Sequence, residues 1–236
     1  MQLDHIATQT NTPRSEFFSG VKAEMPLLIG VIPFGMIYGI LAIAAGLPPS
    51  AAQAMSFIIF AGSSQFVSAQ LYGLNVPGII NVFTVGVINL RHALYSASMA
   101  PYLQKLPTRW KLFLAYLLTD EAYAVSIVHF QQDSDRRYQH WYFFGAGLTL
   151  WTTWQLSTAA GIFLGTSIPT SWSLDFTLAL IFIAIVIPSI KDKASLAAAL
   201  AAGVAAVILF NFPLKTGLLL ASLVGITVGM VIEARS

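Results

Sequence analysis

The feature that most constrains this chain is a run of 65 residues, 26–90, without a single Asp, Glu, Lys, Arg or His. A helix of about 20 apolar residues crosses the hydrocarbon core of a bilayer, so this run can hold two complete membrane segments and most of a third. The rest of the chain agrees, since 9% of its 236 residues are charged, 56% are hydrophobic and the mean hydropathy is +0.73. Soluble domains carry far more charge. The sequence therefore predicts an all-α, polytopic helical membrane protein.

Breaks of charge, Pro and Gly divide the chain into about eight membrane segments, with broken helices expected near the middle of the bilayer. The expected ranges are 25–46, 50–71, 77–101, 111–131, 141–165, 174–189, 194–213 and 215–233. The sixth is short, which suits a tilted, re-entrant or internally buried helix. The first 24 residues are polar and hold no apolar signal core. We therefore expect residues 1–24 to form a cytoplasmic N-terminal segment and residues 25–236 a single transmembrane domain.

The positions of Lys and Arg bear on orientation, because cytoplasmic loops carry an excess of these residues. With eight spans and a cytoplasmic N-terminus, seven basic residues fall inside and four outside. The outer four are Lys105, Arg109, Lys111 and Lys215. Three of them share one loop, which argues against this simple topology. If the second segment were re-entrant, the later loops would change sides and the division would be six against five. Both termini are nevertheless expected inside.

Composition also limits partners and cofactors. The net charge is +2 and no segment forms a dense Lys/Arg patch, so nucleic acid is not an expected partner. The absence of Cys excludes disulfides and thiolate chemistry. The four His residues have no close helical spacing, so neither a metal site nor a cofactor is expected.

The first two polar constellations lie in the uncharged run. Pro33 and the neighbouring glycines indicate a kinked first segment, which is either a packing helix or a flexible element that brings the Tyr38 hydroxyl to a cavity. Ser63, Ser64 and Gln65 directly follow a Gly in the second segment. Three polar side chains there favour a broken helix that binds a polar solute. The alternative is that the hydroxyls bond to their own helix while Gln65 pairs with a neighbour.

The third segment carries Asn89, Arg91, His92 and Tyr95. On a helix, Asn89 and His92 share one face while Arg91 and Tyr95 share the adjoining face, which gives a broad polar stripe. Ionisable groups at this depth cost about 2.5 to 3.5 kcal/mol each on insertion scales and usually line a pathway. Arg91 offers a planar fork that suits a carboxylate, and His92 changes charge readily near neutral pH.

The fourth segment carries Asp120 and Glu121 in an otherwise apolar stretch. Adjacent side chains lie about 100° apart around a helix, so one of them is expected to face a neighbour while the other sits at a helix boundary. A carboxyl that alternates between a desolvated site and a nearby Arg can carry a proton. The alternative is a static ion pair between Arg91 and one of these acids that holds two helices together.

Small residues recur along the last segment. They are Gly217, Ala221, Gly225 and Gly229. Their four-residue spacing gives a smooth helix face that suits either internal packing or the docking of a second membrane subunit.

Four sequence motifs occur in order along this chain: PFGMIYGILA, FAGSSQF, NLRHALYSASMAPYL and TDEAYAV. Together they resemble the AzlC-type branched-chain amino-acid permease family, closely over residues 26–128. The resemblance implies a transport domain in a bacterial inner (cell) membrane that exports branched-chain amino acids, and methionine, along the proton gradient. It also implies a small membrane partner of the AzlD type. On this basis the substrate-binding candidates are Tyr38, Ser63, Ser64, Gln65, Asn89, Arg91 and Tyr95. Our hypothesis for proton coupling is His92, Asp120 and Glu121.

The residue chemistry suits a zwitterionic aliphatic substrate. Arg91, or the N–H groups of a broken helix, would hold the carboxylate, and Asp120 or Glu121 would hold the ammonium group. Phe60, Phe66 or Trp154 would contact the aliphatic side chain.

Two other function classes stay open. An intramembrane serine hydrolase would use Ser63 or Ser64 as nucleophile, His92 as base and Asp120 as orienter, although the G-x-S-x-G elbow is absent. A channel or a non-transporting assembly subunit is the other alternative.

Overall fold

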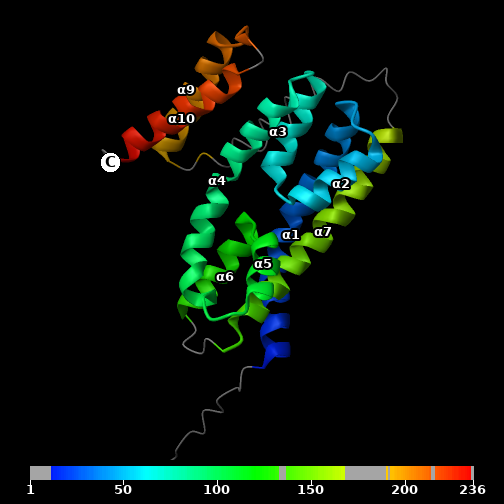
Figure 1. The fold of residues 1–236 in the computed structure, drawn as a ribbon, viewed down its shortest axis with the longest axis vertical. Helices are drawn as coiled ribbons and strands as arrows, with labels where there is room; N and C mark the ends of the chain where they lie inside the picture. Colours follow the sequence, from blue (N-terminus) through cyan, green and yellow to red (C-terminus); the bar gives the residue numbers. More distant parts are fainter. Residues whose placement is uncertain (1–11, 133–136, 168–189, 191, 214–215, 235–236) are drawn as a thin grey trace, which may run out of the picture.

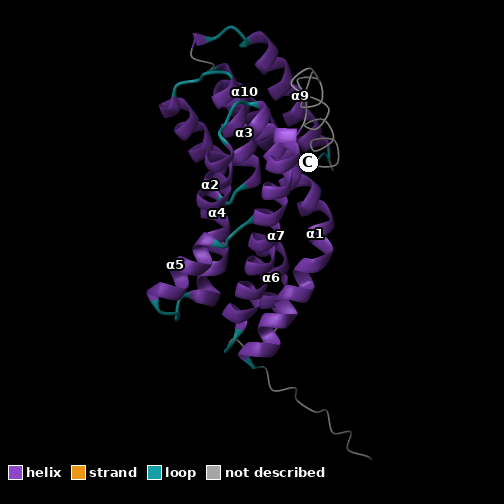
Figure 2. Cartoon of the chain, turned by 90° about the vertical axis from the view of Figure 1, so that its right-hand side faces the viewer, coloured by secondary structure: helices purple, strands orange, loops and turns teal. Residues whose placement is uncertain are grey.

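The computed structural model describes residues 12–132, 137–167, 190, 192–213 and 216–234. All regular secondary structure in this part of the chain is helical, without a strand, as the sequence predicts (Figures 1 and 2). Its helices are α1 Pro13–Ala44, α2 Pro49–Ile59, α3 Gly62–Gly73, α4 Gly78–Leu103, α5 Thr108–Tyr116, α6 Asp120–Gln132, α7 Gln139–Ser167, α9 Lys193–Ile208 and α10 Gly217–Glu233. The expected sixth segment, 174–189, lies outside the described residues.

Helix α1 begins well before the expected start of the first segment at residue 25. Thr12 caps it through a capping box with Ser15, and Pro13 occupies the first turn, where no backbone donor is needed. The second half of the expected N-terminal segment is thus helical and continuous with the first membrane segment. The helix runs through both Pro26 and Pro33 to Ala44.

Helices α1 and α7 run parallel and form the spine of the molecule. A Cβ on Gly20 would collide with the backbone at Tyr142, and one on Gly39 would collide with the backbone at Thr158. Because both contacts advance in the same direction along the two helices, the helices are parallel. The glycines allow their backbones to approach closely, as in other membrane helix pairs.

The second expected segment is two helices that turn back rather than one span. Helix α2 ends at Ile59 and α3 begins at Gly62, so the predicted break is confirmed. However, Gly73 at the end of α3 packs on Ala45, just after the end of α1 and before the start of α2. Both ends of the α2–α3 pair therefore lie at the same end of the bundle. We call this pair the first hairpin.

The fourth expected segment is also divided, at residues 117–119. Helix α5 begins beside α7, since the Trp110 ring lies 5.1 Å from those of both His140 and Trp141. Helix α6 ends beside the end of α4, where the Phe130 and Tyr102 rings lie 5.3 Å apart. Both ends of the α5–α6 pair therefore lie where α1 begins. We call this pair the second hairpin.

The two hairpins enter the bundle from opposite ends and meet at their tips. Figure 1 shows α2 and α3 in the upper half and α5 and α6 in the lower half. At the junction the Tyr116 hydroxyl donates to the Phe57 carbonyl and accepts a 2.7 Å bond from Trp151 Nε1. The chain thus repeats one motif, a long helix followed by a hairpin, in inverted orientation. The sequence reading of eight spans is wrong at the second and fourth segments, because apolar length alone does not distinguish a hairpin from a span.

Among the described helices, α1 alone meets length and hydropathy criteria for crossing a membrane. Helices α4 and α7 have 26 and 29 residues, about 39 and 44 Å of helix, but contain more polar side chains. Of these helices, α4 brings Arg91 and His92 to the interior site described below, and α7 brings Leu150 and Trp154.

The helices α9 and α10 pack mainly on each other and lie at the upper left of the molecule in Figure 1. A Cβ on Gly225 would lie 2.8 Å from the Ala202 side chain, and one on Gly229 would lie 3.2 Å from Ala198. The small-residue stripe of the last segment is therefore used in internal packing, the first of the two predicted alternatives.

Candidate functional site

The tip of the first hairpin is built by an unusual backbone turn. Phe60 adopts a left-handed conformation, with φ 42° and ψ 48°, and ends α2. Gly62 then starts α3 where a Cβ would meet Phe34 at 2.9 Å and Trp154 at 3.0 Å. The break leaves the N-terminus of α3 pointing toward the centre of the bundle. The first-turn N–H groups and the positive end of the helix dipole favour an anion at that position.

The three polar residues after Gly62 have separate partners. The Ser63 Oγ accepts a 2.6 Å hydrogen bond from Arg91 Nη2, while Ser64 Oγ donates to Asn89 Oδ1 at 2.6 Å. Gln65 is fully buried, and its Oε1 accepts from Trp154 Nε1 at 3.1 Å. The first hairpin is thus tied to α4 and α7 at its tip.

The tip of the second hairpin presents two acids. Asp120 and Glu121 form the first turn of α6, where negative charge is favoured by the helix dipole. The sequence reading placed them within a segment and allowed one to lie at a helix boundary, whereas the structure places both at a helix start. No Gly or Pro marks this break, so local sequence signals did not reveal it.

An ion pair joins the second tip to the long helix α4. Arg91 Nη1 lies 2.7 Å from Asp120 Oδ2, and both side chains are about one third exposed. Since its other terminal nitrogen contacts Ser63, Arg91 connects the two tips through one planar fork. The ion pair considered from the sequence therefore forms, and Asp120 is its acid.

A cavity of about 310 Å³ lies between the two tips. Its polar wall consists of Ser63, Arg91, His92, Thr119, Asp120 and Glu121, and its apolar wall includes Val31, Phe34, Phe60, Leu150 and Trp154. The long helices α1, α4 and α7 contribute residues near their midpoints. The cavity thus lies at mid-depth in the bundle, and its size suits a small ligand.

The structure brings five of the predicted site residues to this cavity: Ser63, Arg91, His92, Asp120 and Glu121. The other five support its walls or lie elsewhere. Ser64, Gln65 and Asn89 make the contacts given above. The Tyr38 hydroxyl is buried and donates to the Ala52 carbonyl at 3.0 Å, and the Tyr95 ring stacks on Tyr123 with centroids 4.4 Å apart. Their binding roles stay predictions.

The arrangement differs from that of a serine hydrolase. Ser63 is bonded to Arg91 and Ser64 to Asn89, and within the described residues neither hydroxyl is hydrogen-bonded to His92. A nucleophile must contact its general base. The contacts suit ligand binding rather than nucleophilic attack.

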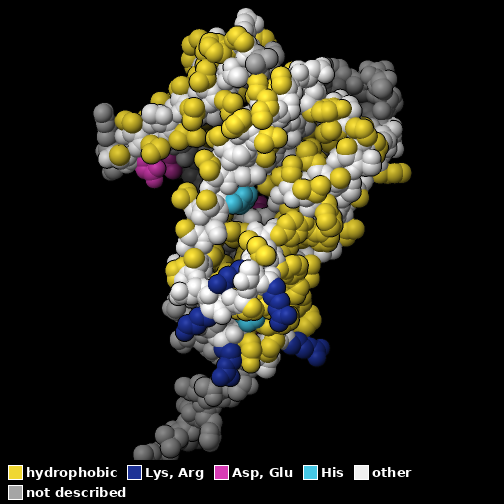
Figure 3. Space-filling model, in the orientation of Figure 1, with side chains coloured by type: hydrophobic (Ala, Val, Ile, Leu, Met, Phe, Trp, Pro, Cys, Tyr) yellow, Lys and Arg dark blue, Asp and Glu magenta, His cyan; other side chains and the backbone are white. Residues whose placement is uncertain are grey.

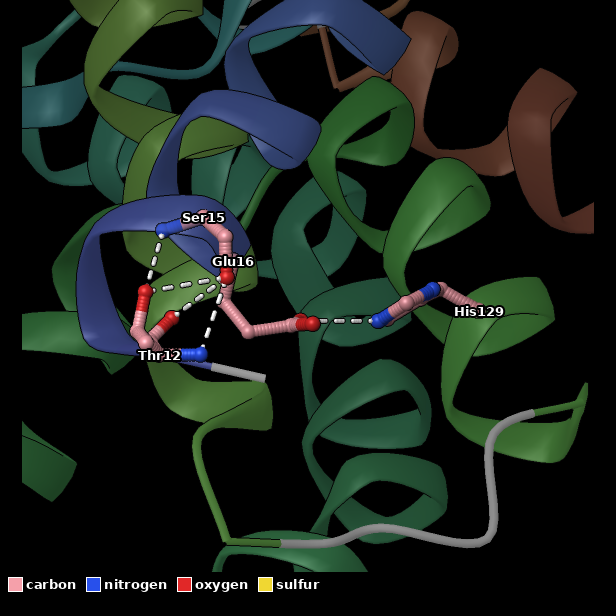
Figure 4. Close-up of polar contacts among 4 residues, drawn as sticks. All are labelled: Thr12, Ser15, Glu16 and His129. Atoms are coloured by element: carbon pink, nitrogen blue, oxygen red, sulfur yellow. Dashed lines mark hydrogen bonds and ion pairs between the residues drawn. The ribbon is translucent and has the colours of Figure 1, made fainter. Parts of the chain in front are cut away.

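Below the cavity lies an acidic cluster that the sequence reading missed. Glu24 of α1 is fully buried, and neither of its carboxylate oxygens has a hydrogen-bond partner within the described residues. Glu16, two turns earlier, is bonded to His129 Nε2 at 2.9 Å (Figure 4). From the sequence, both positions are expected in the N-terminal segment 1–24. The available signal was an acid, Glu24, just before the uncharged run of 65 residues.

Comparison with known proteins identifies the family of this chain. The sequence model of the family described as AzlC protein matches residues 26–168, which covers more than half of the chain. This protein belongs to the AzlC family. The matched range includes both hairpins and every residue that lines the cavity.

Named relatives agree with this assignment. The AzlC-family chain is 30% identical to the Escherichia coli inner membrane protein YgaZ, over 84% of this chain and 83% of that protein. It is also 30% identical to the Bacillus subtilis branched-chain amino acid transport protein AzlC, over 83% and 77% respectively. An uncharacterized membrane protein of Archaeoglobus fulgidus is 29% identical over 75% and 77%. No solved structure matches significantly. These relatives confirm the helical membrane class and support a role in transport.

Proposed function

We propose that this AzlC-family protein is the large subunit of a secondary transporter that exports branched-chain amino acids, with methionine as a further substrate, in exchange for protons. The observation that carries the proposal is a single Arg–Asp ion pair in a small cavity with an apolar wall. A zwitterionic aliphatic amino acid presents one anion, one cation and one apolar group, which are the three features that this cavity complements.

Binding can proceed by exchange of ion pairs. The substrate carboxylate would bind to the Arg91 guanidinium and the N-terminus of α3. The substrate ammonium group would bind to Asp120 or Glu121 at the start of α6. Because one positive and one negative charge enter together, neither Arg91 nor Asp120 is left without a counter-charge in a poorly solvated site. The aliphatic side chain would lie against Phe60 or Trp154.

The distribution of basic residues supports an orientation with the N-terminus in the cytoplasm. Of the eight described Lys and Arg residues, six lie at the end of the bundle where α1 begins: Arg14, Lys22, Lys105, Arg109, Lys111 and Arg137. Figure 3 shows dark blue side chains gathered at that lower end. The positive-inside rule assigns this end to the cytoplasm. The three basic residues that contradicted an eight-span topology are on the same side as the N-terminus once both hairpins are re-entrant.

Proton coupling would use the ionisable groups that share the cavity. His92, Asp120 and Glu121 line it together with the proposed substrate site. A proton and a substrate that compete for the same acids cannot occupy them together, which is the basis of exchange in opposite directions. A small AzlD-type membrane subunit is part of the proposal. The apolar exposed faces of α9 and α10 supply membrane-embedded surface against which such a subunit could pack.

The test is efflux of valine or isoleucine from preloaded proteoliposomes, with this chain alone and together with its small partner, with and without an imposed pH gradient. We expect efflux that requires both chains and is stimulated by the gradient. Saturable counterflow separates a carrier from a channel. Absence of flux in all conditions would contradict the proposal.

A further inference from the structure

Two acids lie on neighbouring helices at the lower side of the cavity. Glu24 lies on α1 and Glu121 on α6, and these two helices pack against each other. The Glu24 side chain has no accessible surface, so it contacts neither solvent nor lipid. It also forms no ion pair within the described part of the chain. An ionised carboxylate buried without a partner is costly, and a second acid close by adds repulsion.

A second pair, Glu16 and His129, lies about two helical turns closer to the end of the bundle where α1 begins. Eight residues separate Glu16 from Glu24 on α1, and eight also separate Glu121 from His129 on α6. The two helices run in opposite directions, and Glu16 bonds to His129, so both pairs lie between the same two helices. Eight helical residues span about 12 Å. Figure 4 shows the Glu16 side chain reaching from α1 to His129 at the outer step.

Polar groups occupy the interval between these pairs. Ser126 of α6 is fully buried, and its Oγ has no hydrogen-bond partner within the described residues. From α7, Tyr142 stacks on His129 with ring centroids 3.8 Å apart. The polar groups along this interval are thus acids, a hydroxyl, an imidazole and a phenol, and no described Lys or Arg forms an ion pair with Glu24. Such a row of exchangeable protons is typical of proton relays inside membrane proteins.

We propose that Glu24 and Glu121 form an acid pair that binds one proton, and that Glu24 passes this proton between the cavity and the Glu16–His129 pair at the basic end of the molecule. The proposal rests on the proton-coupled transport proposed above and adds Glu24 as the proton-binding group. When the shared proton lies on Glu121, that carboxyl is neutral and the cavity favours release of a cationic ammonium group. When the proton has moved to Glu24, or has left past His129, Glu121 is ionised and can hold the ammonium group.

The first experiment detects the proton itself and does not depend on transport. Infrared spectra of the purified protein, titrated across neutral pH, report the carbonyl stretch of a protonated carboxyl. We expect such a band in the unmodified protein near neutral pH and its loss in Glu24→Gln. A band of equal intensity in both proteins, or no band in the unmodified protein, would overturn the proposal. Elution as a single species from a sizing column checks that each variant is folded.

The second experiment separates coupling from substrate binding. In proteoliposomes, Glu24→Gln should lower gradient-driven valine efflux by about tenfold or more while leaving substrate counterflow within about twofold of normal. Counterflow persists because exchange of substrate for substrate needs no net proton movement. Glu24→Asp keeps the carboxyl and should restore gradient-driven efflux in part. Asp192→Asn, at the exposed N-cap of α9, is the matched control and should change neither rate.

The outcomes distinguish the two proposals. If the unmodified protein with its partner shows neither efflux nor counterflow, the transport function is wrong, and the infrared result still decides whether Glu24 binds a proton. If transport is normal and Glu24→Gln lowers both rates equally, or neither, Glu24 is not the coupling group.

Discussion

The two hairpins share an architecture and differ in chemistry. Each begins one residue after a proline N-cap, Pro48 or Pro107, runs to the middle of the bundle, breaks and returns. At the first tip, α3 begins with hydroxyl and amide side chains, and its first turn contains no acidic residue. At the second tip, the equivalent first turn of α6 contains Asp120 and Glu121. One helix N-terminus therefore remains available for an anion, while the other is already occupied by acids that suit a cation. Because of this asymmetry, the cavity suits a zwitterion whose carboxylate lies at the first tip and whose ammonium group lies at the second.

The backbone at the two tips differs as well. Phe60 holds a left-handed conformation that is uncommon for an aromatic residue, while no residue of 117–119 has a positive φ. The first tip therefore depends on tight packing around Gly62, and the second depends on its ion pair with Arg91.

The largest expected effect concerns topology. The chain has no Cys, so single cysteines introduced at Asn75 and Lys105 can be labelled without background. With a re-entrant first hairpin, Lys105→Cys should react from the side of the N-terminus and Asn75→Cys from the opposite side. A full span in place of this hairpin would give the reverse assignment for each position. Labelling of right-side-out and inverted vesicles with an impermeant maleimide shows on which side of the membrane each cysteine lies.

The acidic tip should be the more sensitive to charge removal. Asp120→Asn removes the counter-charge of Arg91 inside the bundle, and we expect gradient-driven efflux to fall about 100-fold. Asp192→Asn provides the matched control, because Asp192 is an exposed N-cap of α9 and Asn caps a helix equally well. Efflux from Asp120→Asn within a fewfold of normal would show that the ion pair is dispensable.

The link between the tips should need a planar fork as well as a charge. Arg91→Lys keeps the charge, but a single ammonium group cannot reproduce the two contacts to Asp120 and Ser63. We expect an efflux loss of about tenfold. Adding Ser63→Ala to Arg91→Lys should then cost little more, because the contact is already lost. Full additivity of the two changes would separate Ser63 from Arg91, and near-normal transport by Arg91→Lys would remove Arg91 from the carboxylate role.

The smallest expected effect is on stability at the neutral tip. Gly62→Ala places a methyl group 2.9 Å from Phe34 and should destabilise the protein by about 1 to 3 kcal/mol. Gly86→Ala is the control, because nothing lies within 4 Å of a Cβ at that position. Thermal unfolding of the two variants in detergent compares them. An unchanged midpoint for Gly62→Ala would mean that the first tip has room to relax.

Several parts of this molecule were predictable from local sequence because their signals are local. The uncharged run predicts membrane helices, and three polar residues after Gly62 predict the first break. The depth of Arg91 and of the acids in apolar segments identified the polar wall of the cavity, since such groups are costly unless they line a site. Tyr38 and Tyr95 show the limit of this reasoning, because a tyrosine within a span has the same local pattern whether it faces a cavity or packs between helices.

Other parts were not predictable. A hairpin and a span need the same number of apolar residues, so hydropathy gave the second and fourth segments the wrong topology. The break before Asp120 has no Gly or Pro to announce it. From the sequence alone, Glu24 falls in a polar N-terminal segment, whereas the capped start of α1 at Pro13 extends the helix before the apolar run and brings Glu24 into the bundle.

The sequence by itself determined the solvent in which this chain folds, its helical class and the chemistry available in its interior. Those properties follow from composition and from neighbours within a few residues. Only the tertiary structure decided that two hairpins enter from opposite ends, that their tips share one cavity, and that Glu24 is buried between helices. These contacts join residues far apart in the chain, and their free energy depends on packing between helices rather than on any local pattern.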